Sequence, residues 1–551
     1  MRLVERRIGL LFAGFLLCFL VIIARAFWLQ GVEGSSLASQ AVSQQTEIVE
    51  VPGLRGSLLD RQGNQLASSE DAKTIYATPY QVKNPPQAAA KLAPILGLKK
   101  GEVLEALTEE SGFSYVAQKV GLGAAAKVEQ LGLEGIGELP DSRRVYPQGT
   151  MAGQVIGAVG SEGTGLSGLE MGEESVLAGT NGEQRIVNDA LGDPIRLETV
   201  QEAKDGENVE LTLDPVIQQE TERVLANVGE TYSPVGATAI VVDPRNSQVL
   251  AMANWPPVDP NDLSEVSNED LVNKATEFNY EPGSTFKAFT VAAALEEKLV
   301  TPTTEFVLPP QIQVADRTIE DAEERGTETM SVGTILARSS NVGAVTIGLK
   351  VGEKHFSQWI HRFGFGKPTG VQYPHEEKGI VPPLSEWSGS SIGNMPIGQG
   401  LAVTPMQMVA GYTAIANGGT LKPPQLIKKV GEEEVQEPRG KRVISPEVAL
   451  EIREMLEGVL APGGTASEVS VPGYSLAGKT GTAQVAEDGG YSETKYVASF
   501  IGFAPAKDPQ FLAAVIVDQP QGEIYGGSVA APAFGELASF ALPYLGVPQE
   551  E

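Results

Sequence analysis

Residues 281–299 read EPGSTFKAFTVAAALEEKL, in which a proline–glycine turn leads directly into an apolar helical pattern over Ala288–Leu299. Proline favours the first turn of a helix, so Ser284 is expected there, with Lys287 three residues later on the same helical face. A serine hydroxyl is a poor nucleophile at neutral pH and needs a base to take its proton. A lysine can be that base if burial or a neighbouring cation lowers its pKa. The stretch therefore predicts a serine–lysine pair at a helix start.

Two further short motifs follow along the chain, Ser339–Asn341 and Lys479–Thr482. With Ser284–Lys287 they read as S-x-x-K, S-x-N and K-T-G. Alone, the first is more often a helix cap beside a surface lysine, and the others are usually turns or loops. Together and in this order they are typical of the serine acyltransferases that react with penicillin. The joint pattern predicts an enzyme that attacks an amide with a serine and holds the acyl group.

The second motif supplies two candidate catalytic side chains. Ser339 can relay a proton between Lys287 and the leaving group. Asn341 can donate to a substrate amide or hold a lysine in place. Both follow an apolar stretch over Val332–Ala337, which is expected to carry them to the site.

The third motif is predicted to form an edge strand beside the nucleophile. Lys479 is a candidate catalytic residue, because its charge can lower the pKa of a nearby lysine and can hold a substrate carboxylate with Thr482. Thr480, Gly481 and Thr482 are expected to contact the substrate, and Gly481 lets its backbone approach closely. The backbone amides of Ser284 and Thr482 are candidates for the oxyanion hole, which is usually a large contribution to catalysis.

Composition excludes some classes of function. The 551 residues are 42% hydrophobic and 20% charged, which is ordinary for a globular protein, and the formal charge is −29. A nucleic-acid partner is therefore disfavoured. The histidines, His355, His361 and His375, lie outside the motifs, with no zinc-binding spacing and no G-x-S-x-G elbow. We interpret them as structural and expect no metal and no cofactor.

The N-terminus predicts a membrane anchor over residues 8–29. An apolar run extends from Ile8 to Ala24, which is at the short end of what spans a bilayer. Arginines precede it, so residues 1–7 are expected in the cytoplasm and the rest outside the cell membrane. A cleaved signal peptide is the alternative, because Ala24–Ala26 resembles a cleavage site, but the apolar core is long for one. The single cysteine, Cys18, lies inside the span, so no disulfide is expected outside it.

The rest of the chain divides into two predicted regions. Residues 30–205 have short apolar runs and many turns, and we expect an elongated, non-catalytic α/β module with a modest core. Residues 206–546 contain strand patterns over Ala237–Val242, Val249–Ala253, Tyr496–Phe503 and Phe511–Val517. A capping box at Thr404 and a Ser445-Pro446 pair begin two helices. An α+β fold is predicted, with a central antiparallel sheet and a helical subdomain.

At this point the chain resembles the class B high-molecular-weight penicillin-binding proteins over nearly its whole length. Tyr280–Lys287 is similar to the nucleophile segment of that family. Arg55–Arg61, Arg144–Pro147 and Gly165–Glu170 resemble the signatures of its non-catalytic module, whose arginines and acids are expected to hold the module together. The stretch Tyr474–Gln484 looks most like the division, or septal, branch.

The resemblance implies a peptidoglycan D,D-transpeptidase. Its substrates would be cell-wall stem peptides ending in D-Ala-D-Ala, and β-lactams would acylate it. The enzyme would release the last D-alanine and pass the acyl group to an amine on a neighbouring stem. No glycosyltransferase domain fits in residues 30–205, so a separate membrane glycosyltransferase of the SEDS class is implied as a partner, together with divisome proteins.

Other functions remain open from the motifs alone. A D,D-carboxypeptidase or a β-lactamase shares the same three motifs, and an elongation-type transpeptidase shares the whole architecture. A membrane sensor that is acylated by β-lactams would need a cytoplasmic effector, for which residues 1–7 are too few.

Overall fold

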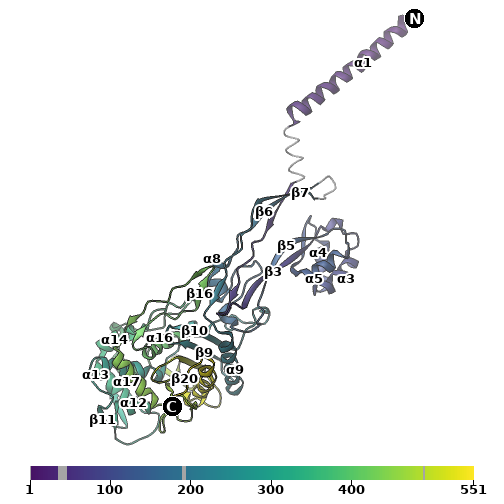
Figure 1. Cartoon of the computed structure of the whole chain (residues 1–551). Coiled ribbons are helices and arrows are strands. Elements are labelled where there is room, and N and C mark those ends of the chain that lie inside the picture. The colour runs from purple at the N-terminus through teal and green to yellow at the C-terminus, as the bar shows by residue number, and fades with distance from the viewer. Residues whose placement is uncertain (1, 35–45, 189–193, 488–489, 551) are drawn as a thin grey trace. The chain divides into compact units, whose positions relative to one another are not determined.

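The computed structural model describes residues 2–34, 46–188, 194–487 and 490–550 (Figure 1). Contacts divide the chain into two compact units that alternate along the sequence. The first comprises Met1–Leu54, Asp71–Arg143 and Gly179–Gly206, and the second comprises Arg55–Glu70, Arg144–Ala178 and Glu207–Glu551. Two short segments from the predicted non-catalytic region are therefore part of the compact unit that carries the three motifs.

The first unit begins with the apolar helix α1 (Arg2–Phe27), followed by the short helical segment η1 (Trp28–Val32). Within the part of the chain that the structure describes, Val4–Val32 is the one helix long and apolar enough to cross a membrane. None of this apolar helix is buried against the rest of the protein, which is compatible with the predicted single-pass anchor.

The remainder of the first unit is a small α/β module. One sheet is antiparallel, in the order β1-β6-β7. Its strands are β1 (Thr46–Val51), β6 (Gly182–Asn188) and β7 (Pro194–Gln201). A second group contains β4 (Ser114–Gly121), α3 (Pro85–Leu96), α4 (Lys100–Thr108) and α5 (Leu122–Glu129), together with the larger part of β3 (Gln65–Ala77) and of β5 (Ile136–Val145). A separate cluster including Leu92, Val103 and Leu107 forms its core, which confirms the α/β module of modest core.

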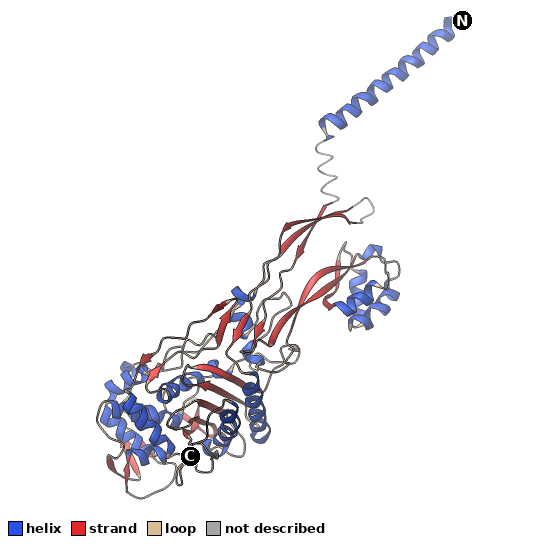
Figure 2. Ribbon diagram, viewed as in Figure 1, coloured by secondary structure: helices blue, strands red, loops and turns tan. Residues whose placement is uncertain are grey.

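The second unit is built around a five-stranded antiparallel sheet in the order β10-β9-β21-β20-β19. Its strands are β9 (Gly236–Asp243), β10 (Gln248–Trp255), β19 (Ala477–Glu487), β20 (Gly490–Ala504) and β21 (Phe511–Asp518). The four strand patterns of the sequence are thus confirmed, and the third motif lies on the edge strand β19 as predicted. Every residue of β9 is buried, because helices cover both faces of the sheet (Figure 2).

Helices α9 (Pro215–Tyr232) and α19 (Ala531–Tyr544) pack against each other and against the sheet. Helix α16 (Pro405–Ala416), which is buried along its whole length, packs on β9, β20 and β21. The predicted capping box begins α16: Gln407 N donates to Thr404 Oγ1 (3.1 Å) and Thr404 N donates to Gln407 Oε1 (3.0 Å). Each of these two hydrogen bonds gives a partner to a backbone N–H at the start of the helix that would otherwise lack one.

A helical subdomain packs around α11 and carries the first two motifs. Its helices are α11 (Lys287–Glu296), α12 (Val332–Ala337), α13 (Asn341–Val351), α14 (Glu353–Arg362) and α17 (Pro446–Glu457). Two antiparallel strand pairs lie between α11 and α12 in sequence: β11 (Glu305–Leu308) with β14 (Glu328–Ser331), and β12 (Gln311–Val314) with β13 (Arg317–Glu320). The fold is the predicted α+β arrangement.

A smaller set of strands in the second unit joins its early segments to the rest. Strand β8 (Val209–Leu211) pairs parallel with β2 (Leu58–Leu59) and antiparallel with β16 (Ile427–Val430). Strand β17 (Glu433–Glu434) turns back on β16. Its two glutamates are exposed.

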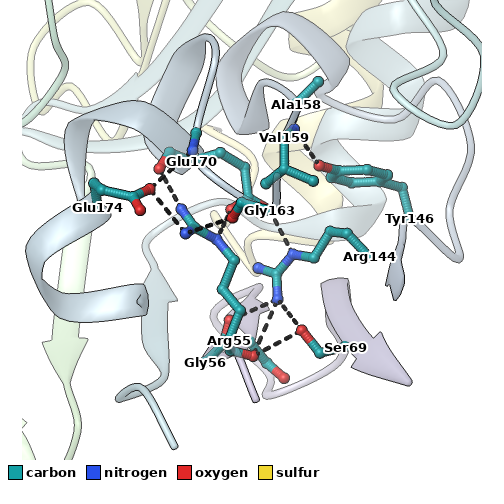
Figure 3. Close-up of polar contacts among 12 residues, drawn as sticks. Arg55, Gly56, Ser69, Arg144, Tyr146, Ala158, Val159, Gly163, Glu170 and Glu174 are labelled. Carbon is teal, nitrogen blue, oxygen red and sulfur yellow. Dashed lines mark hydrogen bonds and ion pairs between the residues drawn. The ribbon is translucent and has the colours of Figure 1, made fainter. Parts of the chain in front are cut away.

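A buried ion cluster connects the non-catalytic signatures inside the second unit (Figure 3). Glu170, whose side chain has no exposed surface, accepts from Arg55 Nε (2.6 Å) and Arg144 Nε (2.6 Å). Arg55 also pairs with the more exposed Glu174 (2.8 Å), and Arg144 Nη1 donates to the carbonyl of Gly56 (2.8 Å). Two arginines from separate segments thus share one buried carboxylate. This supports the expectation that the arginines and acids of these signatures hold their segments together.

Candidate active site

The three motifs meet where the subdomain packs against the sheet edge. Ser284 lies in η3 (Gly283–Phe286), a 3₁₀ turn that leads into α11. Ser339 and Asn341 lie at the junction of α12 and α13. Lys479 and its neighbours lie on β19, which packs against η3. The structure thereby brings together segments that are far apart in sequence.

The backbone around Ser284 is tightly held. Gly283 has a φ of +53°, in the left-handed region that favours glycine, and its N–H donates to Gly398 O (3.0 Å). Thr285 Oγ1 donates to Pro282 O (2.7 Å), and the buried Tyr412 OH donates to Thr285 O (2.7 Å). Ser284 itself is only partly buried. A partly exposed serine on a fixed turn suits a nucleophile.

Lys287 is buried at the centre of the site, with 1% of its surface exposed. Its Nζ donates to Ser339 O (2.6 Å), Asn341 Oδ1 (2.6 Å) and, at 3.2 Å, Ser339 Oγ. Burial lowers the pKa of Lys287 to about 7, against the opposing effect of the Asp321 carboxylate. A large fraction of free amine is therefore present near neutral pH, as a general base requires.

The second motif forms a constrained turn around this amine. Ser339 has a φ of +60°, a left-handed conformation that is uncommon for a residue with a side chain. Ser340 caps α13 by accepting from Gly343 N (3.0 Å). Asn341 Nδ2 donates to Glu320 O (2.8 Å), which leaves its Oδ1 facing Lys287. Of the two roles expected for Asn341, holding a lysine is the one seen in this structure.

Lys479 has no exposed surface. Its Nζ donates to Thr480 O (3.2 Å) and Thr480 Oγ1 (3.3 Å), and the Thr480 hydroxyl also bonds to that of Thr465 (2.6 Å). Burial lowers the pKa of Lys479 well below its usual value, and repulsion from Lys287 adds to this. The repulsion thus acts on Lys479, whereas the causes of the shift at Lys287 are burial and, opposing it, the Asp321 carboxylate.

Gly481 and Thr482 complete the third motif. A Cβ atom on Gly481 would collide with Ser499 Oγ and lie 3.0 Å from Thr285 Cγ2. The glycine is therefore required for β19 to pack against the nucleophile turn, a reason the sequence did not show. Thr482 Oγ1 accepts from Gly526 N (3.0 Å), so its own proton remains available for an acceptor such as a carboxylate.

Three side chains near the nucleophile turn were missed by the motif search. Tyr491 OH donates to Glu281 Oε1 (3.2 Å), which also accepts from Gly400 N (2.9 Å). The Arg317 guanidinium lies over the Tyr491 ring, 5.3 Å from its centroid. Strand β13, the turn before Ser284 and the β19–β20 hairpin are thus connected. Only Glu281 had a sequence signal, because it precedes the Pro282-Gly283 pair.

The histidines have partners outside the motifs. His361 Nδ1 lies 3.2 Å from Phe365 O, and His355 Nδ1 lies 3.9 Å from Glu297 Oε2. Both are on α14, and His375 occupies a loop with a φ of +56°. Nothing in these contacts favours a serine–histidine triad over the serine–lysine pair.

Two family descriptions match this chain. Residues 237–539 match the family described as "Penicillin binding protein transpeptidase domain", and residues 50–211 match "Penicillin-binding Protein dimerisation domain". The chain is 36% identical to the stage V sporulation protein D of Bacillus subtilis over 547 residues, covering 96% of this chain and 84% of that protein. It is 30% identical to the peptidoglycan D,D-transpeptidase FtsI of Buchnera aphidicola over 535 residues, covering 95% and 92%.

A solved structure is similar to this chain. The crystal structure of penicillin binding protein 3 from Mycobacterium tuberculosis complexed with aztreonam superimposes with a TM-score of 0.72. The two chains are 30% identical, and the match covers 91% of this chain and 98% of the other.

Proposed function

Because the chain belongs to the class B penicillin-binding proteins of the division type, we infer that it is a serine-type peptidoglycan D,D-transpeptidase with Ser284 as its nucleophile. One observation carries the assignment of the site. Lys287, on the helix that begins at the serine turn, is buried with a pKa near 7 and donates to both Ser339 and Asn341. This is a base prepared for a serine hydroxyl.

Acylation follows from these positions. The free amine of Lys287 takes the proton of Ser284 Oγ while the oxygen attacks the carbonyl carbon of the penultimate D-alanine. The amides of Ser284 and Thr482 stabilise the oxyanion of the tetrahedral intermediate. Ser339 then passes the proton from Lys287 to the departing nitrogen. The C–N bond breaks, D-alanine leaves as a neutral amine, and the acyl group remains on Ser284 as an ester.

Lys479, Thr480 and Thr482 hold the terminal carboxylate of the donor stem, with Gly481 between them on the edge strand. Burial lowers the pKa of Lys479. A bound carboxylate acts in the opposite direction, because a nearby negative charge favours the ammonium form. The same groups would hold the carboxylate of a β-lactam and so place its carbonyl for attack by Ser284.

The second half-reaction distinguishes a transpeptidase from a hydrolase. An amine from a neighbouring stem attacks the ester carbonyl, Lys287 takes its proton, and Ser284 leaves as the restored hydroxyl. A D,D-carboxypeptidase would use water instead. Incubation with a D-Ala-D-Ala donor and an amine acceptor, followed by mass spectrometry, tests this. A cross-linked product is expected, and hydrolysed donor as the sole product would refute transpeptidation.

The nucleophile is tested by covalent labelling with a fluorescent penicillin. Ser284→Ala should abolish labelling, since loss of the nucleophile costs on the order of 10⁶ in kcat for serine hydrolases. Ser385→Ala, an exposed serine elsewhere in the same unit, is the matched control and should label like the wild type. Labelling of Ser284→Ala at the wild-type rate would refute the assignment.

The cellular role is part of the proposal. Residues 1–7 lie in the cytoplasm, the anchor crosses the cell membrane once, and the catalytic unit lies outside. A SEDS-class membrane glycosyltransferase makes the glycan strands that this enzyme cross-links, within the divisome. Septal localisation of a fluorescent fusion in growing cells is expected. Uniform side-wall fluorescence would favour elongation, and recruitment only in sporulating cells would favour the role that the name of the Bacillus subtilis relative indicates.

A further inference from the structure

Asp321 lies directly after β13 and fastens the turn of the second motif from outside it. Its carboxylate accepts from Ser340 Oγ (2.9 Å) and from the backbone N–H of Val342 (3.0 Å), in the first turn of α13. The residue before it, Glu320, accepts from Asn341 Nδ2. Two consecutive residues, the last of β13 and the one that follows it, thus hold every residue from Ser340 to Val342.

The carboxylate is itself buried and held. Arg325 Nε donates to Asp321 Oδ2 (2.6 Å), and the two side chains are 7% and 10% exposed respectively. Arg325 Nη1 donates to Leu308 O and Gly326 O, each at 3.0 Å. Although burial raises the pKa of Asp321, the bonds from Val342, Arg325 and Ser340 outweigh it and keep the pKa below its usual value. Asp321 therefore remains an anion at neutral pH.

This anion acts on Lys287 in two ways. The acceptors of the lysine, Ser339 O and Asn341 Oδ1, belong to the turn that Asp321 fastens. A negative charge also favours the ammonium form, so it opposes the effect of burial on the lysine. The turn and the charge thus depend on one carboxylate.

Other charged groups near Lys287 are accounted for. Lys479 lies on β19, where repulsion from Lys287 helps to lower the pKa of Lys479, and Arg325 is paired with Asp321. The buried Tyr412 hydroxyl on α16 has a raised pKa and stays neutral. At the far end of α11, Glu297 lies 3.9 Å from His355. Among the described residues, Asp321 is the anion that acts on Lys287.

We propose that Asp321 is a positioning residue of the acylation reaction, which holds the Ser339–Asn341 turn against Lys287 and sets the proton affinity of that lysine. The inference rests on the proposed role of Lys287 as base. Without Asp321 the lysine would lose its proton more readily but would be held less firmly.

The test is the pH dependence of acylation by a fluorescent penicillin, measured from pH 5 to 9 on the full-length protein in detergent. The acid limb is the part of this profile in which the rate falls as pH falls. In Asp321→Asn it should move to lower pH by about one unit, which is the lower end of the pKa change that a nearby opposite charge produces. Its plateau rate should fall about tenfold, because the turn is less firmly held. Asp321→Glu should return the limb to its wild-type position, because it restores the charge.

Two further variants make the result decisive. Asp316→Asn removes an exposed charge from the turn of the same hairpin and should leave the limb unchanged. Arg325→Gln leaves Asp321 uncompensated and should move the limb upward, so the inference stays testable if Asp321→Asn does not fold. An equal loss at every pH with no movement of the limb in Asp321→Asn, or a downward movement in Arg325→Gln, would overturn it. A wild type that cannot be labelled would instead refute the proposed function and this inference with it.

Discussion

Acylation of Ser284 should depend steeply on pH, because the proposed base is a buried lysine with a pKa near 7. The reactive form of Lys287 is the free amine, whose fraction falls as pH falls through the pKa. For a pKa of about 7 the fraction is about 0.9 at pH 8 and about 0.01 at pH 5. The acylation rate should therefore fall roughly 90-fold between these two values if the amine is required.

The assay is the second-order rate of labelling by a fluorescent penicillin in rapid-quench experiments at constant ionic strength. Near-ultraviolet circular dichroism at each pH shows whether the protein stays folded, which separates titration of the site from acid unfolding. Titration of Asp321 does not contribute to the change in rate, because its pKa lies below the pH range tested. Glu281 titrates at higher pH than an ordinary glutamate, so Glu281→Gln is the appropriate control for the lower part of the curve.

The reasoning would be refuted by a rate that changes less than threefold between pH 5 and pH 8. A midpoint above pH 9 would also refute it, because it would show that Lys287 behaves as an ordinary lysine despite its burial. In either case another group would have to take the proton of Ser284.

Three other predictions follow. Lys287→Arg should nearly abolish acylation, because arginine does not deprotonate in proteins, whereas Lys479→Arg keeps the charge and should retain more activity; the reverse order of labelling rates would contradict the two roles. Glu170→Gln should lower the free energy of unfolding by about 3–5 kcal/mol, since two buried arginines lose their charged partner. Glu174, whose side chain is 38% exposed, is the control, and Glu174→Gln should lower it by about 1 kcal/mol or less. Equal losses of the two variants in denaturant titrations would contradict the importance of the buried ion cluster. A truncated chain beginning at Glu33 should be soluble and still labelled by penicillin but fail to support wall synthesis in cells; a folded, unlabelled truncation would show that the span shapes the site.

Local sequence determined the features that depend on neighbours a few residues apart. The capping box at Thr404 forms as predicted because its two bonds lie within one helical turn. The strands over 237–242 and 249–253 form because a turn sequence separates two apolar runs. Boundaries were less accurate: α11 ends at Glu296 rather than Leu299, since Lys298 has a φ of +55°, which a helix does not allow.

The identity of the reacting groups was also readable from the sequence. Serine and lysine three residues apart at a helix start must share a face, whereas the position of Lys479 at the edge of the sheet depends on how the strands pair. Ser284 itself lies in a 3₁₀ turn rather than in the α-helix proper, a distinction of hydrogen bonding that no residue pattern in the segment reveals.

Tertiary structure alone decided how those groups behave. The pKa of Lys287 depends on its exclusion from water, and that exclusion comes from segments far apart in the chain packing around it. Asp321 carries no motif, and its contact with Ser340 becomes visible only when the β12–β13 hairpin and the start of α13 are placed together. The sequence itself contains the chemical groups of the motif residues. The burial of the Lys287 amine and the electrostatic potential at that amine depend on many residues distant in sequence, which only the folded chain brings together.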